Sequence, residues 1–264
     1  MSKYITSLEL WKSLGSDAFT KVRSETTTTT SDNTIFDFAQ QNLISGSETI
    51  YVGGAAVSTG FTMNYDDGKI DFASAPAAVP TGDYLYTGIE DSAVQKTLLS
   101  SDEELEKVVG QSFSLATTSE TIDVEQLQTV FFLERAPVNA IVSLSSNTSS
   151  TVTDSPSYLT LTQGLGNDYL FDAPSGRVEI IDNFPVYGQQ RLKVSYSHGY
   201  TFANMPDLVK ELNRLIAVRM MVQNNNFKAI LKGRDNFNQA SLEQINTRIS
   251  TIAALLRVNK YERI

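Results

Sequence analysis

The spacing of hydrophobic and polar positions changes several times along the chain, and these changes predict an alternation of helical and β segments. Apolar residues fall near a helical spacing over residues 4–23, 92–110 and 204–264. Residues 34–89 and 117–200 instead alternate apolar and polar positions between turn residues, which is typical of antiparallel strands. We therefore predict an α+β fold. Its discontinuous helical core (N-terminal, middle and C-terminal helices) carries two inserted antiparallel β modules.

The local signals at the ends of these segments refine the predicted organisation. Thr26 to Thr30 are all threonine, which favours an extended linker or an edge strand. Ser101 to Glu104 fit a capping box, and Gly110 is a natural helix C-cap. The predicted domains are residues 1–24 (N-terminal helical segment), 25–91 (first β module), 92–116 (middle helices), 117–200 (second β module) and 201–264 (C-terminal helical segment).

The two β segments resemble each other around one hairpin. Asp67-Gly68-Lys69-Ile70 aligns with Ser175-Gly176-Arg177-Val178, and in both segments a loop containing proline and a closing strand with tyrosine follow. A glycine between alternating strands favours a tight turn, because it adopts positive φ at little cost. This pattern is explained either by a duplicated module or by the general likeness of β-hairpins.

The last predicted helix carries a narrow apolar seam. Its members are Leu242, Ile245, Ile249, Ile252 and Leu256, which follow one another at intervals of three and four residues. This spacing is suited to helix–helix packing, within one chain or between chains.

Charge is distributed unevenly along the chain. The net charge is −9, but residues 201–264 contain 10 Lys/Arg and 5 Asp/Glu, whereas the other residues contain 11 and 25. A mildly basic C-terminal segment and an acidic remainder indicate two different faces. Disulfides and cysteine chemistry are excluded because the chain has no cysteine, and its one histidine excludes a multi-histidine metal cluster within one chain.

Candidate catalytic and metal-binding residues are few. His198 ends a predicted strand, and we interpret it as a turn or surface residue rather than a catalytic base. Asp66, Asp67 and Asp71 surround a hairpin; they could bind Ca²⁺, but their spacing is not that of an EF-hand and turn chemistry alone explains them. The strand tyrosines form either an exposed binding stripe or half-buried strand positions. No phosphate-binding loop, GxSxG elbow or HExxH motif is present. We therefore predict no enzymatic activity, no cofactor and no metal site.

The N-terminal region and the hydropathy of the chain predict no membrane association. The first residues contain no continuous apolar stretch of the kind found in signal peptides, and no segment approaches 18 consecutive apolar residues. We expect the protein to be made and used in a cytoplasm, or assembled there into something else.

The closing part of the chain resembles a known protein family. In HGYTFANMPDLVKELNRLIAVRMM a strand ends in a Tyr-x-x-Gly-Tyr turn, and a Pro-Asp start and an amphipathic helix follow. This order, together with the final ISTIAALLRVNKYERI, resembles head–tail adaptor (head-completion, connector) proteins of tailed phages and related archaeal viruses. The resemblance covers mainly residues 90–112 and 195–264, and the long β insertions depart from the family's simpler helical plan.

The resemblance implies a structural protein at the head–tail interface of a virion. Its expected partners are the portal protein, a tail-completion or tail-terminator protein and further copies of itself, which form a dodecameric ring around a channel where DNA passes without specific binding. The C-terminal helix would embrace the portal. The residues expected at this portal or oligomer interface are Leu242, Ile245, Ile249, Ile252, Leu256, Arg257, Tyr261 and Ile264.

Two alternatives to the adaptor remain open. The chain could be another virion component, such as a tail, baseplate or head-decoration protein, because tyrosine-rich β modules suit that role. It could also be a hydrolase or a carbohydrate-binding protein built on the β modules.

Overall fold

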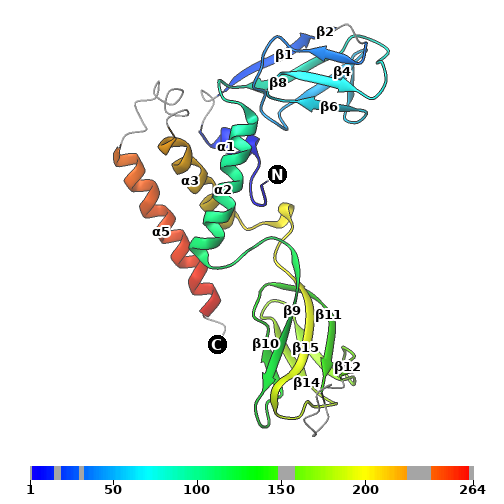
Figure 1. Ribbon diagram of the computed structural model, residues 1–264, viewed down its shortest axis with the longest axis vertical. Coiled ribbons are helices and arrows are strands. Elements are labelled where there is room, and N and C mark those ends of the chain that lie inside the picture. The colour runs from blue at the N-terminus through cyan, green and yellow to red at the C-terminus, as the bar shows by residue number, and fades with distance from the viewer. Residues whose placement is uncertain (1, 15–18, 30–32, 148–157, 225–238, 262–264) are drawn as a thin grey trace. The chain divides into compact units, whose positions relative to one another are not determined.

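The chain folds into two units, which the ribbon in Figure 1 presents with their secondary structure. The computed structural model describes residues 2–14, 19–29, 33–147, 158–224 and 239–261, and on the last helix it describes the side chains of residues 242–256. Unit 1 comprises residues 1–111 and 207–259, and unit 2 comprises residues 112–206 and 260–264.

The helices of unit 1 come from three separate parts of the sequence. They are α1 (Ser7–Leu14), α2 (Asp91–Val109), α3 (Asp207–Gln223) and α5 (Gln239–Tyr261). A buried apolar cluster joins them: Leu10 and Trp11 of α1, Leu98 of α2 and Met221 of α3 are each at most 1% exposed. The predicted α+β class, with helices and inserted antiparallel β modules, is confirmed.

Each unit contains one β module. The strands of the first module are β1 (Thr20–Thr26), β2 (Thr28–Thr29), β3 (Ile35–Asp37), β4 (Thr49–Val52), β5 (Ala55–Val57), β6 (Phe61–Asn64), β7 (Lys69–Phe72) and β8 (Thr81–Tyr86). The strands of the second module are β9 (Ala116–Val124), β10 (Val130–Phe132), β11 (Val138–Ser146), β12 (Leu159–Thr160), β13 (Tyr169–Asp172), β14 (Arg177–Ile180) and β15 (Gly188–His198), and the short 3-10 helix η2 (Phe202–Asn204) follows.

The helix predicted over residues 4–23 is found at Ser7–Leu14 and is wrong over residues 20–23, and residues 15–18 lie outside the described part of the structure. Residues 20–26 form β1, which pairs antiparallel with β8, and Val22 lies opposite Tyr84. The β-branched residues of this stretch favour a strand once a partner strand is available. The adjoining threonines Thr28 and Thr29 form the edge strand β2, as the threonine run predicted.

The capping box predicted at residues 101–104 is also wrong, because this stretch lies in the middle of α2. Helix α2 begins at Asp91, and the side chain of Ser101 donates to the carbonyl of Leu98 within the helix, at 2.8 Å. Gly110 is the C-cap, as predicted: it has φ of 81°, and its amide donates to the carbonyl of Glu106.

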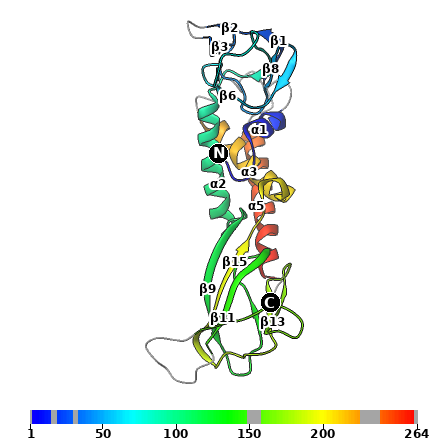
Figure 2. The ribbon, with the colours of Figure 1, turned by 90° about the vertical axis from the view of Figure 1, so that its right-hand side faces the viewer.

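The two β modules have the same topology. One sheet of the first module has the strand order β1-β8-β4-β5, and the corresponding sheet of the second has β9-β15-β11-β12. The opposing sheets are β2-β3-β7-β6 and β10-β14-β13, which differ only by the edge strand β2. All pairs of neighbouring strands are antiparallel. Figure 2 gives a second view of both modules.

The aligned hairpins are equivalent residue by residue. Asn64 pairs with Lys69 across the first turn, and Asp172 pairs with Arg177 across the second. In both turns the last residue is a glycine with φ of 67°. The carbonyls of Gly68 and Gly176 accept bonds from the amides of Phe38 and Leu133, at 2.9 and 3.0 Å, so each hairpin is fixed to the preceding strand at the same point.

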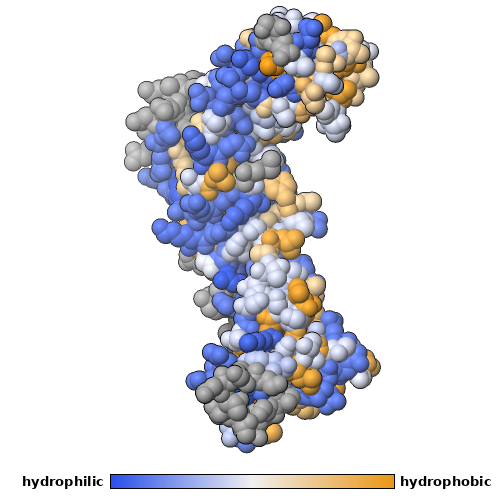
Figure 3. All heavy atoms as spheres, turned by 45° about the vertical axis from the view of Figure 1, so that its right-hand side comes forward, coloured by the Kyte–Doolittle hydropathy of each residue, from blue (hydrophilic) through white to orange (hydrophobic). Residues whose placement is uncertain are grey.

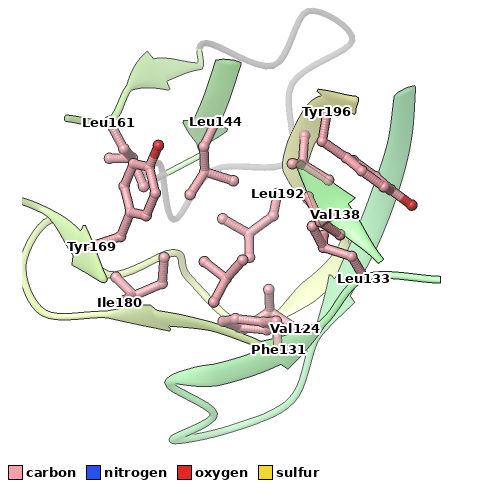
Figure 4. Close-up of a cluster of buried hydrophobic side chains, with 12 residues drawn as sticks. Val124, Phe131, Leu133, Val138, Leu144, Leu161, Tyr169, Ile180, Leu192 and Tyr196 are labelled. Carbon is pink, nitrogen blue, oxygen red and sulfur yellow. The ribbon is translucent and has the colours of Figure 1, made fainter. Parts of the chain in front are cut away.

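Each module has its own apolar core between its two sheets. In the second module the core includes Phe131, Leu144, Leu192 and Tyr196, all at most 2% exposed (Figure 4). In the first module Phe36 and Ile70 occupy the positions that correspond to Phe131 and Val178. The modules therefore bury equivalent side chains.

Replacing Gly68 by alanine should destabilise the first module more than replacing Gly53. Both glycines have positive φ, which costs an alanine about 1 kcal/mol. A Cβ at Gly68 would also lie 2.0 Å from the carbonyl oxygen of Gln40, whereas a Cβ at Gly53 meets nothing within 4 Å. Chemical denaturation of Gly68→Ala and Gly53→Ala measures the difference, and equal midpoints would contradict the close approach at Gly68.

Candidate interaction surfaces

The apolar seam predicted on the last helix lies on α5, and its described members face the chain's own core. Leu242 and Ile245 pack against the apolar cluster of α1, α2 and α3. Ile249, Ile252 and Leu256 are 5%, 5% and 7% exposed. Their apolar surface is therefore covered by the same chain. Their assignment to a portal or oligomer interface stays a prediction.

The other predicted interface residues are outside the described part of the structure: the side chains of Arg257 and Tyr261, and all of Ile264. The outward face of α5 is polar or small at most positions, and Leu255, at 51% exposed, is the large apolar residue on the described part of that face. The exposed positions are Glu243, Gln244, Asn246, Thr247, Arg248, Ser250, Thr251, Ala254 and Leu255.

A groove of about 740 Å³ runs along α3 and α5. It is lined by Leu208, Glu211, Glu243, Gln244, Thr247, Arg248, Thr251 and Ile252. One of its ion pairs joins Arg248 to Glu211, with 2.5 Å between Nη2 and Oε1, and Arg214 lies 3.7 Å from the same oxygen. Because the Arg248 side chain is 63% exposed, solvent screens this pair and its net contribution is about 0.5 kcal/mol or less. The pair orients charges at the groove rather than stabilising the fold.

A buried carboxylate on α2 holds the segment that precedes α1. Asp102 is 2% exposed and accepts three hydrogen bonds: from Ser2 Oγ at 2.8 Å, from the Lys3 amide at 2.7 Å and from Asn213 Nδ2 at 2.8 Å. Burial raises the pKa of Asp102, and the bonds from Lys3, Ser2 and Asn213 act in the opposite direction. One side chain thus joins the N-terminal segment, α2 and α3.

The next turn of α2 adds a second attachment for the same segment. Glu106 accepts from the hydroxyl of Tyr4 at 2.7 Å and pairs with Lys3 Nζ at 2.8 Å. Tyr4 is fully buried, so its ring supplies apolar contact while its hydroxyl keeps a partner. The start of the chain is therefore an integral part of the helical core.

Removing the Asp102 carboxylate should destabilise unit 1 by about 3 kcal/mol, because two buried donors and one partly buried donor lose their acceptor. Urea denaturation of Asp102→Ala measures this loss. The exposed neighbour Glu103 provides the control, since Glu103→Ala removes one carboxylate from the same helix without leaving a buried donor. Similar midpoints for the two variants would contradict the role given to Asp102.

A tyrosine–glutamate pair ties the edge of the first module together. The hydroxyl of Tyr84 donates to Glu25 of β1, and the other oxygen of Glu25 accepts from the amide of Ala39 at 2.5 Å. Burial, followed by the bond to Glu25, raises the pKa of Tyr84. The pair joins β1, β8 and the chain after β3.

The second module repeats this arrangement at the equivalent positions. The hydroxyl of Tyr196 lies 3.4 Å from Glu120 Oε2, and Glu120 Oε1 accepts from the amide of Glu134 at 3.3 Å. The amide of Arg135 donates to the Tyr196 hydroxyl at 3.1 Å. Burial raises the pKa of Tyr196 to about 12. Figure 4 shows this hydroxyl at the margin of the apolar cluster.

Replacing Glu120 by glutamine should weaken the pH dependence of unit 2. Burial raises the pKa of Glu120 above its ordinary value of 4.5, so the folded state binds a proton more tightly than the unfolded state. That contribution to stability is lost as the pH rises from 4.5 through the raised pKa. Glu120→Gln removes the titration but keeps an acceptor for the Glu134 amide.

Denaturation at a series of pH values above 4.5 measures this effect. We expect the unfolding free energy of Glu120→Gln to fall less steeply with pH than that of the unmodified chain. Glu125→Gln, at an exposed position of the same module, is the control. An unchanged slope in Glu120→Gln would show that Glu120 does not titrate in this way.

The interpretation of His198 as a turn or surface residue is wrong. His198 is the last residue of β15 and is 6% exposed, with its ring centroid 5.8 Å from that of Tyr196. Burial lowers its pKa, and the positive charge of Arg135 lowers it further. The side chain packs as part of the strand end.

The aspartates of the first hairpin make local and structural bonds. Asp67 exchanges bonds with Asn64, at 2.7 and 3.2 Å, and Asp66 accepts from the amide of Ser92 at the start of α2, at 3.1 Å. Within the described residues, no three His, Cys, Asp or Glu side chains are grouped so that they could hold a metal ion.

The strand tyrosines are structural. None of the seven is exposed, which agrees with half-buried or buried positions rather than a binding stripe. They are Tyr51, Tyr65, Tyr84, Tyr86, Tyr158, Tyr169 and Tyr196. Five lie on strands as predicted, whereas Tyr65 lies in the hairpin turn and Tyr158 directly before β12. Among the helices that the structure describes, none combines the length and the hydrophobicity needed to cross a membrane.

Comparison with known proteins finds similar solved structures but no matching family and no matching curated protein. No family model and no curated protein matches the chain. It is similar to a chain of the "Neck of empty GTA particle computed with C6 symmetry", with 13% identity and a TM-score of 0.39, over 53% of this chain and 71% of that chain. It is also similar to a chain of the "Virion of native gene transfer agent (GTA) particle", with 12% identity and a TM-score of 0.37, over 55% and 78%.

A third similar chain comes from the "Neck of native GTA particle computed with C12 symmetry", with 12% identity and a TM-score of 0.38. This similarity covers 54% of the present chain and 81% of the other. Similarity at this level does not determine what the present chain does.

Proposed function

We propose that this chain is a structural protein of a tailed-virus neck, and specifically the head–tail adaptor. In this role identical copies form a ring under the portal, link the capsid to the tail and surround the DNA channel. The sequence resemblance over residues 90–112 and 195–264 points to this family. Those residues include all of α2, α3 and α5, and so most of the helical core.

The main support for the proposal is the way in which three segments of the chain assemble the helical core. Three distant parts of the chain meet at one buried carboxylate, Asp102, and both β modules are inserted between those parts. Each module has an apolar core of its own. A fixed helical body with separately folded modules supports contacts with several neighbours at once, which is what a connecting ring requires.

The charge distribution supports the same role. The chain is acidic overall, with a net charge of −9. Negative charge facing a channel repels DNA phosphates and lets the genome pass without specific binding. The Lys/Arg excess of residues 201–264 suits an acidic surface on the portal. Binding to the portal should therefore weaken as salt is added.

Native mass spectrometry of the purified chain, alone and mixed with its portal, tests the ring. We expect a closed ring, of twelve copies in the simplest case, to form alone or on the portal. A monomer that ignores the portal would contradict the adaptor role and favour another tail, baseplate or decoration protein.

Two matched surface variants test whether α5 contributes to ring formation or to portal binding. Leu255 lies on the outward face of α5 and is 51% exposed, and Leu99 lies on α2 and is 43% exposed. We expect Leu255→Ser to weaken ring formation or portal binding roughly tenfold, because a contact would bury this side chain. Leu99→Ser should have no such effect. Equal behaviour of the two variants would remove α5 from the interface.

A further inference from the structure

The start of helix α2 is capped by a residue of the first β module rather than by its own sequence. Glu90, which precedes the helix, makes no side-chain capping bond. Instead Asp66, in the turn between β6 and β7, accepts from the amide of Ser92 at 3.1 Å. The first amides of a helix have no partner within the helix, and a carboxylate at this end also interacts favourably with the helix dipole. Asp66 therefore acts as an N-cap that is supplied from outside the helix.

The turn that carries Asp66 is itself fixed to residues 42–44. The carbonyl of Asp66 accepts from the amide of Asn42 at 3.0 Å. The carbonyl of the preceding Tyr65 accepts from the amide of Leu43 at 2.8 Å. The next residue, Ile44, is 1% exposed and belongs to the apolar cluster that joins the helices. The hairpin is thus connected to the helical core through this segment as well as through the cap.

A second carboxylate makes the reciprocal contact, from α2 to the first module. Asp91, the first residue of α2, accepts from the amide of Ser45 and from Gln95 Nε2, both at 3.5 Å, and a side-chain bond from Ser7 joins it to α1. The helices have a largely hydrophilic surface on the face that Figure 3 shows, but Asp91 is 7% exposed. A carboxylate buried to this degree requires donors around it, so Asp91 serves a contact inside unit 1. We call Asp66 and Asp91 the carboxylate joint.

The second β module provides an internal comparison for this joint. Its hairpin has the same length and register, so Pro174 occupies the position of Asp66. A proline side chain has no acceptor, and this hairpin therefore cannot cap a helix in the same way. The first module belongs to the same unit as the helices, whereas the second module belongs to the other unit. The one hairpin that carries the carboxylate is thus the one that belongs with the helices.

We propose that the carboxylate joint makes the first β module and the helical core one cooperative unit, in which the hairpin at residues 64–69 and the first turn of α2 stabilise each other. Asp66 is the positioning residue on the side of the module, and Asp91 is the positioning residue on the side of the helices. Segments that share such contacts open together, whereas segments without them open separately. This coupling does not depend on the proposed adaptor role, and the isolated chain is sufficient to test it.

Native-state hydrogen exchange of the full chain, with and without Gly68→Ala, tests the coupling. A Cβ at Gly68 would lie 2.0 Å from the carbonyl oxygen of Gln40, so this substitution disturbs the hairpin without touching α2. We expect the amides of residues 92–94 to exchange roughly fivefold faster, which is the effect of losing one N-cap. Gly176→Ala, at the equivalent glycine of the second module, is the matched control and should leave these amides unchanged.

The same measurement on Asp66→Ala completes a double-mutant cycle. Asp66→Ala should by itself make the amides of residues 92–94 exchange roughly fivefold faster, and Gly68→Ala should then have no further effect on them. The amides of Asn42 and Leu43, which are bonded to the hairpin, should also exchange faster in Asp66→Ala. Because this readout does not require Gly68→Ala, it decides the question even if that variant does not fold.

Two further variants separate the cap from the loss of charge. Asp66→Asn keeps an acceptor oxygen and should exchange like the unmodified chain. Asp71→Ala removes an exposed carboxylate from β7 of the same hairpin and should also have no effect on residues 92–94.

Faster exchange that is confined to residues 92–94 in Asp66→Ala would overturn the proposal, because Asp66 would then be a local cap without coupling. An effect of Gly68→Ala on α2 that is equally large with and without Asp66 would overturn it as well.

Discussion

The buried carboxylate of Asp102 is the constraint on which the rest of the structure depends. A carboxylate that is 2% exposed is costly unless donors surround it, and here the donors come from the N-terminal segment and from α3. These segments are separated from α2 by the first and the second β module respectively. The helical core is therefore complete only when the chain has returned from both insertions, which couples the formation of the core to the path of the whole chain.

Each insertion is a β module with a core of its own, and the two modules are equivalent to each other in topology. The modules share their strand order, the register of one hairpin and a tyrosine–glutamate pair that fastens the first strand to the rest. An apolar core lies inside each module, so sequence changes in the exposed loops leave the fold intact. In the second module, for example, Leu127 and Leu165 lie in loops and are 93% and 91% exposed. A β module with a fixed core and variable loops suits a protein that binds different neighbours.

The sequence predicted the arrangement of segments because the change between helical and strand periods is long and regular. It failed where a distant partner decides the local structure: residues 20–26 become β1 because β8 pairs with them, and Ser101 lies inside α2 rather than at its start. The equivalence of Glu25 and Glu120 was hidden because the loops that separate them from Tyr84 and Tyr196 differ in length. The seam on α5 was visible in the spacing, but spacing alone does not distinguish packing within the chain from packing between chains.

The central claim is that the chain is a ring component of a virion neck. Electron cryo-microscopy of the assembled particle tests it most directly, because density at the neck would reveal the fold of the helical core and the fold of each β module. The account predicts copies of the chain arranged around the DNA channel between portal and tail. Particles whose neck density contains no such chain, or that place it on the capsid surface or at the baseplate, would contradict the account.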